Sequence, residues 1–250
     1  MVTGFLGDMV ELALLAAAGY LALTVLARRM RPAWSAHLAE RRLVVLVVLV
    51  LAMTAIKVSE EVLAHESGPI DEAILRALHG LVPAALVGFF QAVTASGSSK
   101  VLLPVAAVAT FALAMTTRRR EAWLLAASAL TAPALVYLLK TAVGRVRPAL
   151  WETQWYWGSS FPSGHTLTTA AVSTAAALCV GRIWPRWRDA AMAVALAWLF
   201  LVGLSRLVLG VHWPTDVLAA ACIGILIPLT VDMGLRFRDR ESGAGGPPAA

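Results

Sequence analysis

Three short clusters of polar residues could bind an anion and attack it. They contain three cations, two histidines and one acid, and they run Lys140…Arg147-Pro148, Pro162-Ser163-Gly164-His165 and Ser205-Arg206…His212…Asp216. Cations, backbone N–H groups and imidazoles are the groups that phosphoryl transfer requires when no metal takes part. The clusters therefore indicate chemistry on a phosphate group.

Lys140 and Arg147 come at the end of an apolar stretch. Two cations this close beside a bilayer repel each other, and an anion held between them would remove that repulsion. The alternative interpretation is that both side chains only reach toward lipid headgroups, as long basic side chains at helix ends commonly do.

The second cluster opens an apolar helix. Ser163 is a favourable residue at a helix start, Gly164 permits close approach, and the free backbone N–H groups there form an anion site. Read alone, the same residues are also typical of an ordinary helix cap that happens to contain His165.

His212 and Asp216 lie four residues apart on either side of Pro214. An acid at this spacing can accept the proton of one imidazole nitrogen and leave the other free as a nucleophile or base. A helix-capping Asp beside an interfacial His is the alternative. The residues leave open which of the two histidines attacks.

The elements that must position these clusters are membrane helices. Of the 250 residues 59% are hydrophobic and 14% charged, with a mean hydropathy of +0.75, against about 45–50% and 25% in soluble domains. A helix needs about 20 apolar residues to span a bilayer. The sequence predicts seven spans, at 9–28, 43–62, 100–117, 122–140, 165–181, 189–205 and 213–233. The predicted fold is an all-α, polytopic membrane helix bundle without strands.

The basic residues set the predicted orientation. Fourteen of the 21 Lys and Arg fall in four groups that the seven spans place on one side: Arg28, Arg29, Arg31, Arg41, Arg42; Arg118, Arg119, Arg120; Arg182, Arg186, Arg188; Arg236, Arg238, Arg240. The positive-inside rule makes that side the cytoplasm. The three polar clusters then lie on the extracytoplasmic face of the cell membrane. The net charge of +6 is thus a topology signal, and no nucleic-acid partner is expected.

The remaining segments complete the predicted organisation. Within the outer segment 63–99 we expect a surface helix that begins near Pro69 and a second, short helix closed by a turn at 96–99. Residues 1–42 would form an extra N-terminal span with a basic cytoplasmic loop, 43–236 the core, and 237–250 a disordered tail. Cys179 and Cys222 fit packing positions, and no metal site or cofactor is expected.

The three clusters resemble the signature of the type 2 phosphatidic acid phosphatases, in the same order. The resemblance covers Lys140 to Asp216 closely and the spans from 100 to 233 in layout. It implies a six-span core with a phosphohistidine intermediate. His212 would attack phosphorus, Asp216 would orient it, and His165 would protonate the leaving oxygen and then activate water. The resemblance further implies a set of phosphate-binding residues: Lys140, Arg147, Ser163, Gly164 and Arg206.

The predicted activity is therefore metal-independent hydrolysis of a lipid phosphate or diphosphate. Alternatives are a phosphotransferase with the same phosphohistidine, a halide-oxidising relative, which the spans disfavour, and a non-enzymatic membrane protein. The lipid stays open among polyprenyl diphosphates such as undecaprenyl diphosphate, phosphatidylglycerol phosphate, phosphatidate, and sphingoid or sugar-linked polyprenyl phosphates, as does the oligomeric state. Arg145 could touch a second phosphate or a headgroup, and Trp151, Trp155, Tyr156 and Trp157 suggest an aromatic belt or a wall beside the lipid tail.

Overall fold

Helices make up every regular element in the part of the chain that the structure describes. This computed structural model describes all residues except 1–14, 27, 30–41, 154–157 and 245–250. A helix at Leu15–Leu26 precedes the labelled ones. These are α3 (Arg42–Leu63), α4 (Gly68–Leu81), α5 (Val87–Ser96), α6 (Ser99–Ala114), α7 (Arg119–Val143), α8 (Gly164–Ile183), α9 (Arg188–Val208) and α10 (Pro214–Ala244), with short 3-10 turns at Ala84–Leu86 and Pro185–Trp187.

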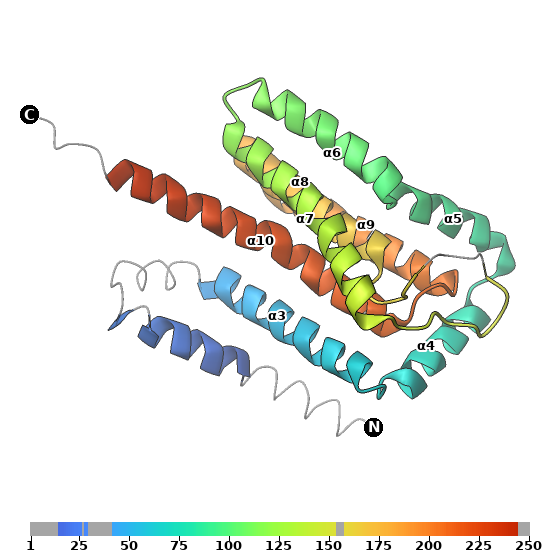
Figure 1. The fold of residues 1–250 in the computed structure, drawn as a ribbon. Coiled ribbons are helices and arrows are strands. Elements are labelled where there is room, and N and C mark those ends of the chain that lie inside the picture. The colour runs from blue at the N-terminus through green and yellow to red at the C-terminus, as the bar shows by residue number, and fades with distance from the viewer. Residues whose placement is uncertain (1–14, 27, 30–41, 154–157, 245–250) are drawn as a thin grey trace, which may run out of the picture.

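Five of these helices are long and apolar enough to cross a membrane: α3, α7, α8, α9 with the turn before it, and α10. Their bounds agree with the predicted spans to within a few residues at most ends, which confirms the all-helical, multi-pass class. They run roughly alongside one another (Figure 1).

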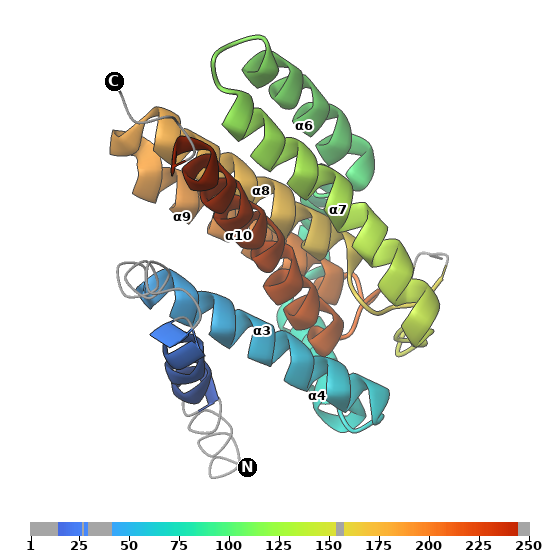
Figure 2. The same cartoon turned by 60° about the vertical axis from the view of Figure 1, so that its left-hand side comes forward.

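α8 lies at the centre of the bundle. It packs against α7, α9 and α10, and α3 and α6 cover α10 and α7 from outside (Figures 1 and 2). Small residues such as Ala170, Ala171 and Ala175 are fully buried along α8 and let its neighbours approach closely. Gly224 of α10 is one such approach, because a Cβ there would lie 2.5 Å from that of Ala170.

The segment before α6 contains the two helices that the sequence predicts. α4 begins beside Pro69 as expected. The segment Ala84–Ser96, which consists of the 3-10 turn and α5, follows α4 at a bend of 98°. α5 is a short separate helix that ends at Ser96, as predicted, and it packs against α9. After the break, α6 continues along nearly the same line (Figure 1). Gly97 marks the break between α5 and α6. A Cβ on Gly97 would lie 2.6 Å from Val202, so only glycine lets the end of α5 lie this close to α9.

The first and the last described helices differ from the prediction in extent. The Leu15–Leu26 helix lies beside α3 (Figures 1 and 2), and Gly19 faces Leu49. The rest of the predicted span 9–28 lies mostly outside the described residues. α10 continues to Ala244, so residues 237–244, predicted as a disordered tail, are helical. This stretch is rich in charged residues that favour helices, and residues 245–250 fall outside the described part.

Candidate active site

The three polar clusters meet at one end of the bundle. Lys140 lies in the last turn of α7, which ends at Gly144 in a left-handed conformation (φ 65°). The chain then crosses to the start of α8, while α9 ends near Arg206 and α10 begins just after His212. A left-handed residue after a helix favours glycine because it lacks a Cβ.

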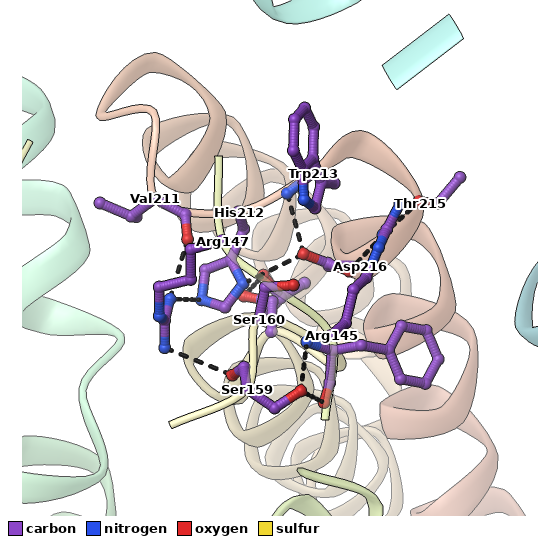
Figure 3. A network of polar contacts seen from close by, with 12 residues as sticks. Arg145, Arg147, Ser159, Ser160, Val211, His212, Trp213, Thr215 and Asp216 are labelled. Carbon is purple, nitrogen blue, oxygen red and sulfur yellow. Dashed lines mark hydrogen bonds and ion pairs between the residues drawn. The ribbon is translucent and has the colours of Figure 1, made fainter. Parts of the chain in front are cut away.

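His212 lies between a cation and an acid. Its Nε2 is 3.3 Å from a terminal nitrogen of Arg147, and its Nδ1 is 3.5 Å from Oδ2 of Asp216 (Figure 3). A guanidinium has only N–H donors, so the nitrogen that faces it must carry the lone pair. That tautomer places the imidazole proton on Nδ1, toward Asp216. The distance to Asp216 is slightly longer than an ordinary hydrogen bond.

The surroundings of His212 keep it neutral. Its exposed fraction is 2%. Burial lowers the pKa of His212 to about 4, the charges of Arg206 and Arg147 push in the same direction, and Asp216 opposes them. A neutral imidazole can act as a nucleophile, whereas an imidazolium cannot.

The cations of the first cluster hold the segment that leads to α8. The carbonyl of Ser159 accepts hydrogen bonds from Nζ of Lys140 and from Arg147, the latter at 3.4 Å. Arg147 also donates to the carbonyl of Val211 at 2.8 Å, and the backbone N–H of Ser160 donates to the carbonyl of Arg145 at 2.8 Å. These contacts bring the first and third clusters together.

Ser163 and His165 stand at the start of α8. Ser163 is fully buried, and its hydroxyl accepts a hydrogen bond from Thr166 at 2.9 Å and caps no backbone N–H. Its own N–H donates to the carbonyl of Asp216 at 3.2 Å, which joins the beginnings of α8 and α10. His165 lies within electrostatic reach of Lys140, Arg147, Arg206 and His212.

Arg206 is buried, with an exposed fraction of 1%, and is held by a residue that the sequence did not single out. A terminal nitrogen of Arg206 donates to the hydroxyl of Thr94 on α5 at 2.6 Å. No spacing in the sequence links these positions, because 112 residues separate them.

The contacts of Arg145 contradict the role predicted for it. It was expected to touch a second phosphate or a headgroup, but its two terminal nitrogens donate to Asp216 at 2.6 Å and to Asp71 of α4 at 2.7 Å. Asp71, fully buried, also accepts from the backbone N–H and the hydroxyl of Thr215, at 3.0 and 2.6 Å. Ser67 accepts a further bond from Arg145 at 2.9 Å. Two buried carboxylates thus neutralise Arg145 and leave it no role toward an anion.

The aromatic segment is described only in part. Trp151 stacks on His79 of α4, with ring centroids 4.1 Å apart. Trp155, Tyr156 and Trp157 lie outside the described residues. In the part that is described, no three His, Cys, Asp or Glu side chains are grouped to hold a metal ion.

Comparison with known proteins identifies the family. The pattern of the PAP2 superfamily matches residues 121–232. The decaprenylphosphoryl-5-phosphoribose phosphatase of Mycobacterium tuberculosis is 36% identical over 137 residues, which are 52% of this chain and 71% of that protein. Phosphatidylglycerophosphatase B of Escherichia coli is 47% identical over 66 residues, which are 26% of this chain and 25% of that one. The chain therefore belongs to the PAP2 superfamily.

A solved structure shares the fold. The crystal structure of a transmembrane PAP2-type phosphatidylglycerolphosphate phosphatase from Bacillus subtilis superposes with a TM-score of 0.68 and 25% identity, over 78% of this chain and 96% of that chain. This agrees with a multi-pass membrane protein. The match to the Escherichia coli protein spans only a quarter of the length of that protein.

Proposed function

We propose that this protein is an integral-membrane phosphatase that hydrolyses a lipid phosphate through a phosphohistidine on His212. The observation that carries the proposal is the placement of His212, with Nε2 facing Arg147 at 3.3 Å and Nδ1 facing Asp216 at 3.5 Å (Figure 3). In this geometry the lone pair of Nε2 points toward Arg147, which would hold the phosphate, and Asp216 lies beside the opposite nitrogen of the ring.

The reaction has two steps. Nε2 of His212 attacks phosphorus, the P–N bond forms, the P–O bond to the lipid alcohol breaks, and protonated His165 gives its proton to the leaving oxygen. Water then attacks the phosphohistidine while His165 takes the proton of the water, which releases phosphate and neutral His212. Asp216 stabilises the positive charge on the phosphorylated ring.

The phosphate oxygens are held by charge and by backbone donors. Lys140, Arg147 and Arg206 supply three cations, and Ser163 and the N–H of Gly164 supply donors at the start of α8. Cations and amides of this kind are suited to a phosphate and leave no step that needs a metal. The reaction is therefore proposed to be metal-independent.

The site is proposed to face away from the cytoplasm. At the other end of the bundle, Arg120, Arg182 and Arg236 surround Asp232 of α10, with distances of 3.6 Å from Arg120 and 2.9 Å from Arg236. These three arginines come from three of the basic groups in the sequence, so these groups share one end, which the positive-inside rule assigns to the cytoplasm. We propose that residues 43–236 form the phosphatase core and that residues 1–42 are an addition to it.

Phosphate release from purified protein tests the proposal. We expect free inorganic phosphate from a lipid phosphate in excess chelator, with inhibition by orthovanadate, which resembles five-coordinate phosphorus. Transfer of the phosphate to a second alcohol in place of its release would identify a phosphotransferase instead. Activity that chelator eliminates and one metal restores would contradict the metal-independent mechanism.

A further inference from the structure

An apolar groove of about 480 Å³ runs between α8 and α9. α8 begins at the proposed active site and α9 ends there, so the groove, which lies in the second half of α8 and the first half of α9, belongs to the other end of the bundle. Seven of the described lining residues are Ala or Val, on one face of each helix: Ala176, Ala177, Val180, Ala190, Ala191, Val194 and Ala195. The proposed reaction uses none of them.

The groove opens toward the lipid that would surround the bundle. Val194 on its rim is 69% exposed, whereas Ala195 at its base is 6% exposed. Alanine has no side-chain atom beyond Cβ, so the facing alanines of the two helices leave room between them. The hydrocarbon core of a bilayer contains no water to fill such a space. An acyl chain therefore matches the lining.

Two tryptophans bound the groove along its length. Trp198 lines its inner end, and the indole N–H donates to the hydroxyl of Ser96 of α5 at 3.0 Å, which fixes the ring. Trp187 lines the other end and is 55% exposed, as is typical of Trp at the level of the headgroups. At 1.5 Å per residue the two positions are about 16 Å apart along the helix, close to half of a hydrocarbon core of about 30 Å. The groove thus has the length of one leaflet.

Two arginines lie at the headgroup end of the groove. Arg188 begins α9 and packs across Gly181 of α8, where a Cβ would be 3.0 Å from Cγ of Arg188. The guanidinium of Arg186 lies over the ring of Trp187, 5.9 Å from its centroid. Both side chains are exposed, and these contacts hold their stems beside the mouth of the groove.

The charges of these two arginines are not balanced within the described part of the chain. At the same end of the bundle, Asp232 pairs with Arg236 and two further arginines. Neither Arg186 nor Arg188 forms an ion pair with a described residue, although Asp189 follows them in the first turn of α9. Guanidinium groups bind phosphate oxygens well. A headgroup with net negative charge would complement both cations, whereas a zwitterionic headgroup brings a cation of its own.

We propose that the groove binds one acyl chain of an anionic phospholipid, with the phosphate of its headgroup held by Arg186 and Arg188. The bound lipid is a ligand that the proposed reaction does not consume, because the groove and His212 lie at opposite ends of the bundle.

The headgroup is tested by titrating the purified protein in detergent micelles with dioleoyl phosphatidylserine or dioleoyl phosphatidylcholine and counting bound lipids by native mass spectrometry. We expect one phosphatidylserine to be retained in preference to phosphatidylcholine. Arg186→Gln and Arg188→Gln should each weaken its binding about fivefold, the usual contribution of one cation at an anionic membrane surface. Arg118→Gln, at an exposed arginine of the same end that does not line the groove, is the matched control and should bind as the unaltered protein does.

The acyl chain is tested by filling the groove. Ala191→Phe places a ring inside it and should weaken phosphatidylserine binding severalfold. Ala193→Phe, at an exposed alanine that does not line the groove, should leave binding unchanged. Phosphatidylserine should also raise the unfolding temperature of the unaltered protein, and inorganic phosphate at the same concentration should not, because it has no chain to occupy the groove.

Three results would overturn the proposal. The first is equal retention of the two lipids, or phosphatidylserine binding that the arginine variants and Ala191→Phe leave intact. The second is the same rise in unfolding temperature with inorganic phosphate, which would mean that the arginines bind an anion without the groove. The third is a change in oligomeric mass in Ala191→Phe with unchanged lipid binding, which would mean that a second copy of the chain covers the groove. None of these measurements depends on phosphatase activity.

Discussion

The carboxylate of Asp71 lies 2.7 Å from the guanidinium of Arg145, although 74 residues separate them in the chain. The same guanidinium holds Asp216 at 2.6 Å on its other side. Asp71 therefore reaches the proposed nucleophile through two intermediates, Arg145 and Asp216. It is a positioning residue, because it touches neither His212 nor the place where phosphate would bind.

Asp71→Asn should lower kcat about tenfold with little change in KM. The variant keeps the shape of the side chain but removes the negative charge that Asp71 places beside Arg145, so that Asp216 is the remaining counter-ion. A charge-assisted hydrogen bond is worth about 1.5–3 kcal/mol. The measurement is kcat and KM together with the unfolding temperature. Glu72→Gln, next in the chain and paired with Arg76 at the surface, is the matched control. A lower unfolding temperature with unchanged kcat would make Asp71 purely structural.

His212, and not His165, should carry the phosphoryl group. His212→Gln should eliminate the acid-labile phosphoenzyme, and His165→Gln should slow its formation and breakdown by about 10²–10⁴, the usual contribution of a general acid or base. Asp216→Asn should lower turnover severely while lipid binding survives. Mass spectrometry of rapidly quenched enzyme locates the phosphate. A phosphorylated His165, or a normal phosphoenzyme in His212→Gln, would reverse the assignment.

His212 should stay neutral well below the pH at which an exposed histidine is protonated. Because burial depresses the pKa of His212 to about 4, folding favours the neutral ring. This pKa difference adds to the free energy of unfolding, and the full contribution is present above the unfolded pKa of about 6.5. It is lost as the pH falls from there toward 4, because the unfolded chain then binds the proton first. Ring-nitrogen NMR of the folded protein, assigned with His212→Gln, should show a midpoint near 4, and a midpoint near 6.5 would contradict the burial.

Labelling with a membrane-impermeant thiol reagent tests the proposed orientation. Cys179 and Cys222 are both buried and would be replaced by Ala. Val146→Cys, at a residue 81% exposed beside the site, should then react in intact cells. Met115→Cys, 73% exposed after α6, should react only after permeabilisation. The opposite pattern would place the site in the cytoplasm.

Asp232→Asn should destabilise the bundle without altering the chemistry. Asp232 is 8% exposed and is the shared counter-ion of Arg120, Arg182 and Arg236. Removing one partner of a buried ion pair costs about 3–5 kcal/mol. The unfolding temperature should fall, and kcat per folded molecule should stay the same because the cluster lies at the far end from His212. Asp189→Asn, an exposed acid at the start of α9, is the control, and an equal loss in both variants would show that Asp232 has no special role.

The sequence was sufficient for those parts of the fold and site that depend on local spacing. Apolar runs located the membrane helices, and the four-residue step from His212 to Asp216 predicted their contact, which the structure places at 3.5 Å. Asp71 and Thr94 could not be found in this way. Each reaches its partner only because α4 and α5 fold back onto α9 and α10, and such contacts leave no periodic pattern in the chain.

The positions of the acidic residues explain why the predicted role of Arg145 was wrong. Arg145 lies two residues before Arg147, so the sequence gives both the same apparent role. Only the positions of the acids separate them: two buried carboxylates neutralise Arg145, whereas Arg147 donates to backbone carbonyls and faces His212.

The hydrogen bond from the N–H of Ser163 to the carbonyl of Asp216 brings two helix beginnings to one point. α8 and α10 both run away from the site, so the positive ends of their macrodipoles, each equivalent to about half an elementary charge, add together there. Unlike an amine or an imidazole, an aligned set of peptide dipoles does not titrate. At a pH high enough to deprotonate Lys140, this part of the attraction for an anion would persist.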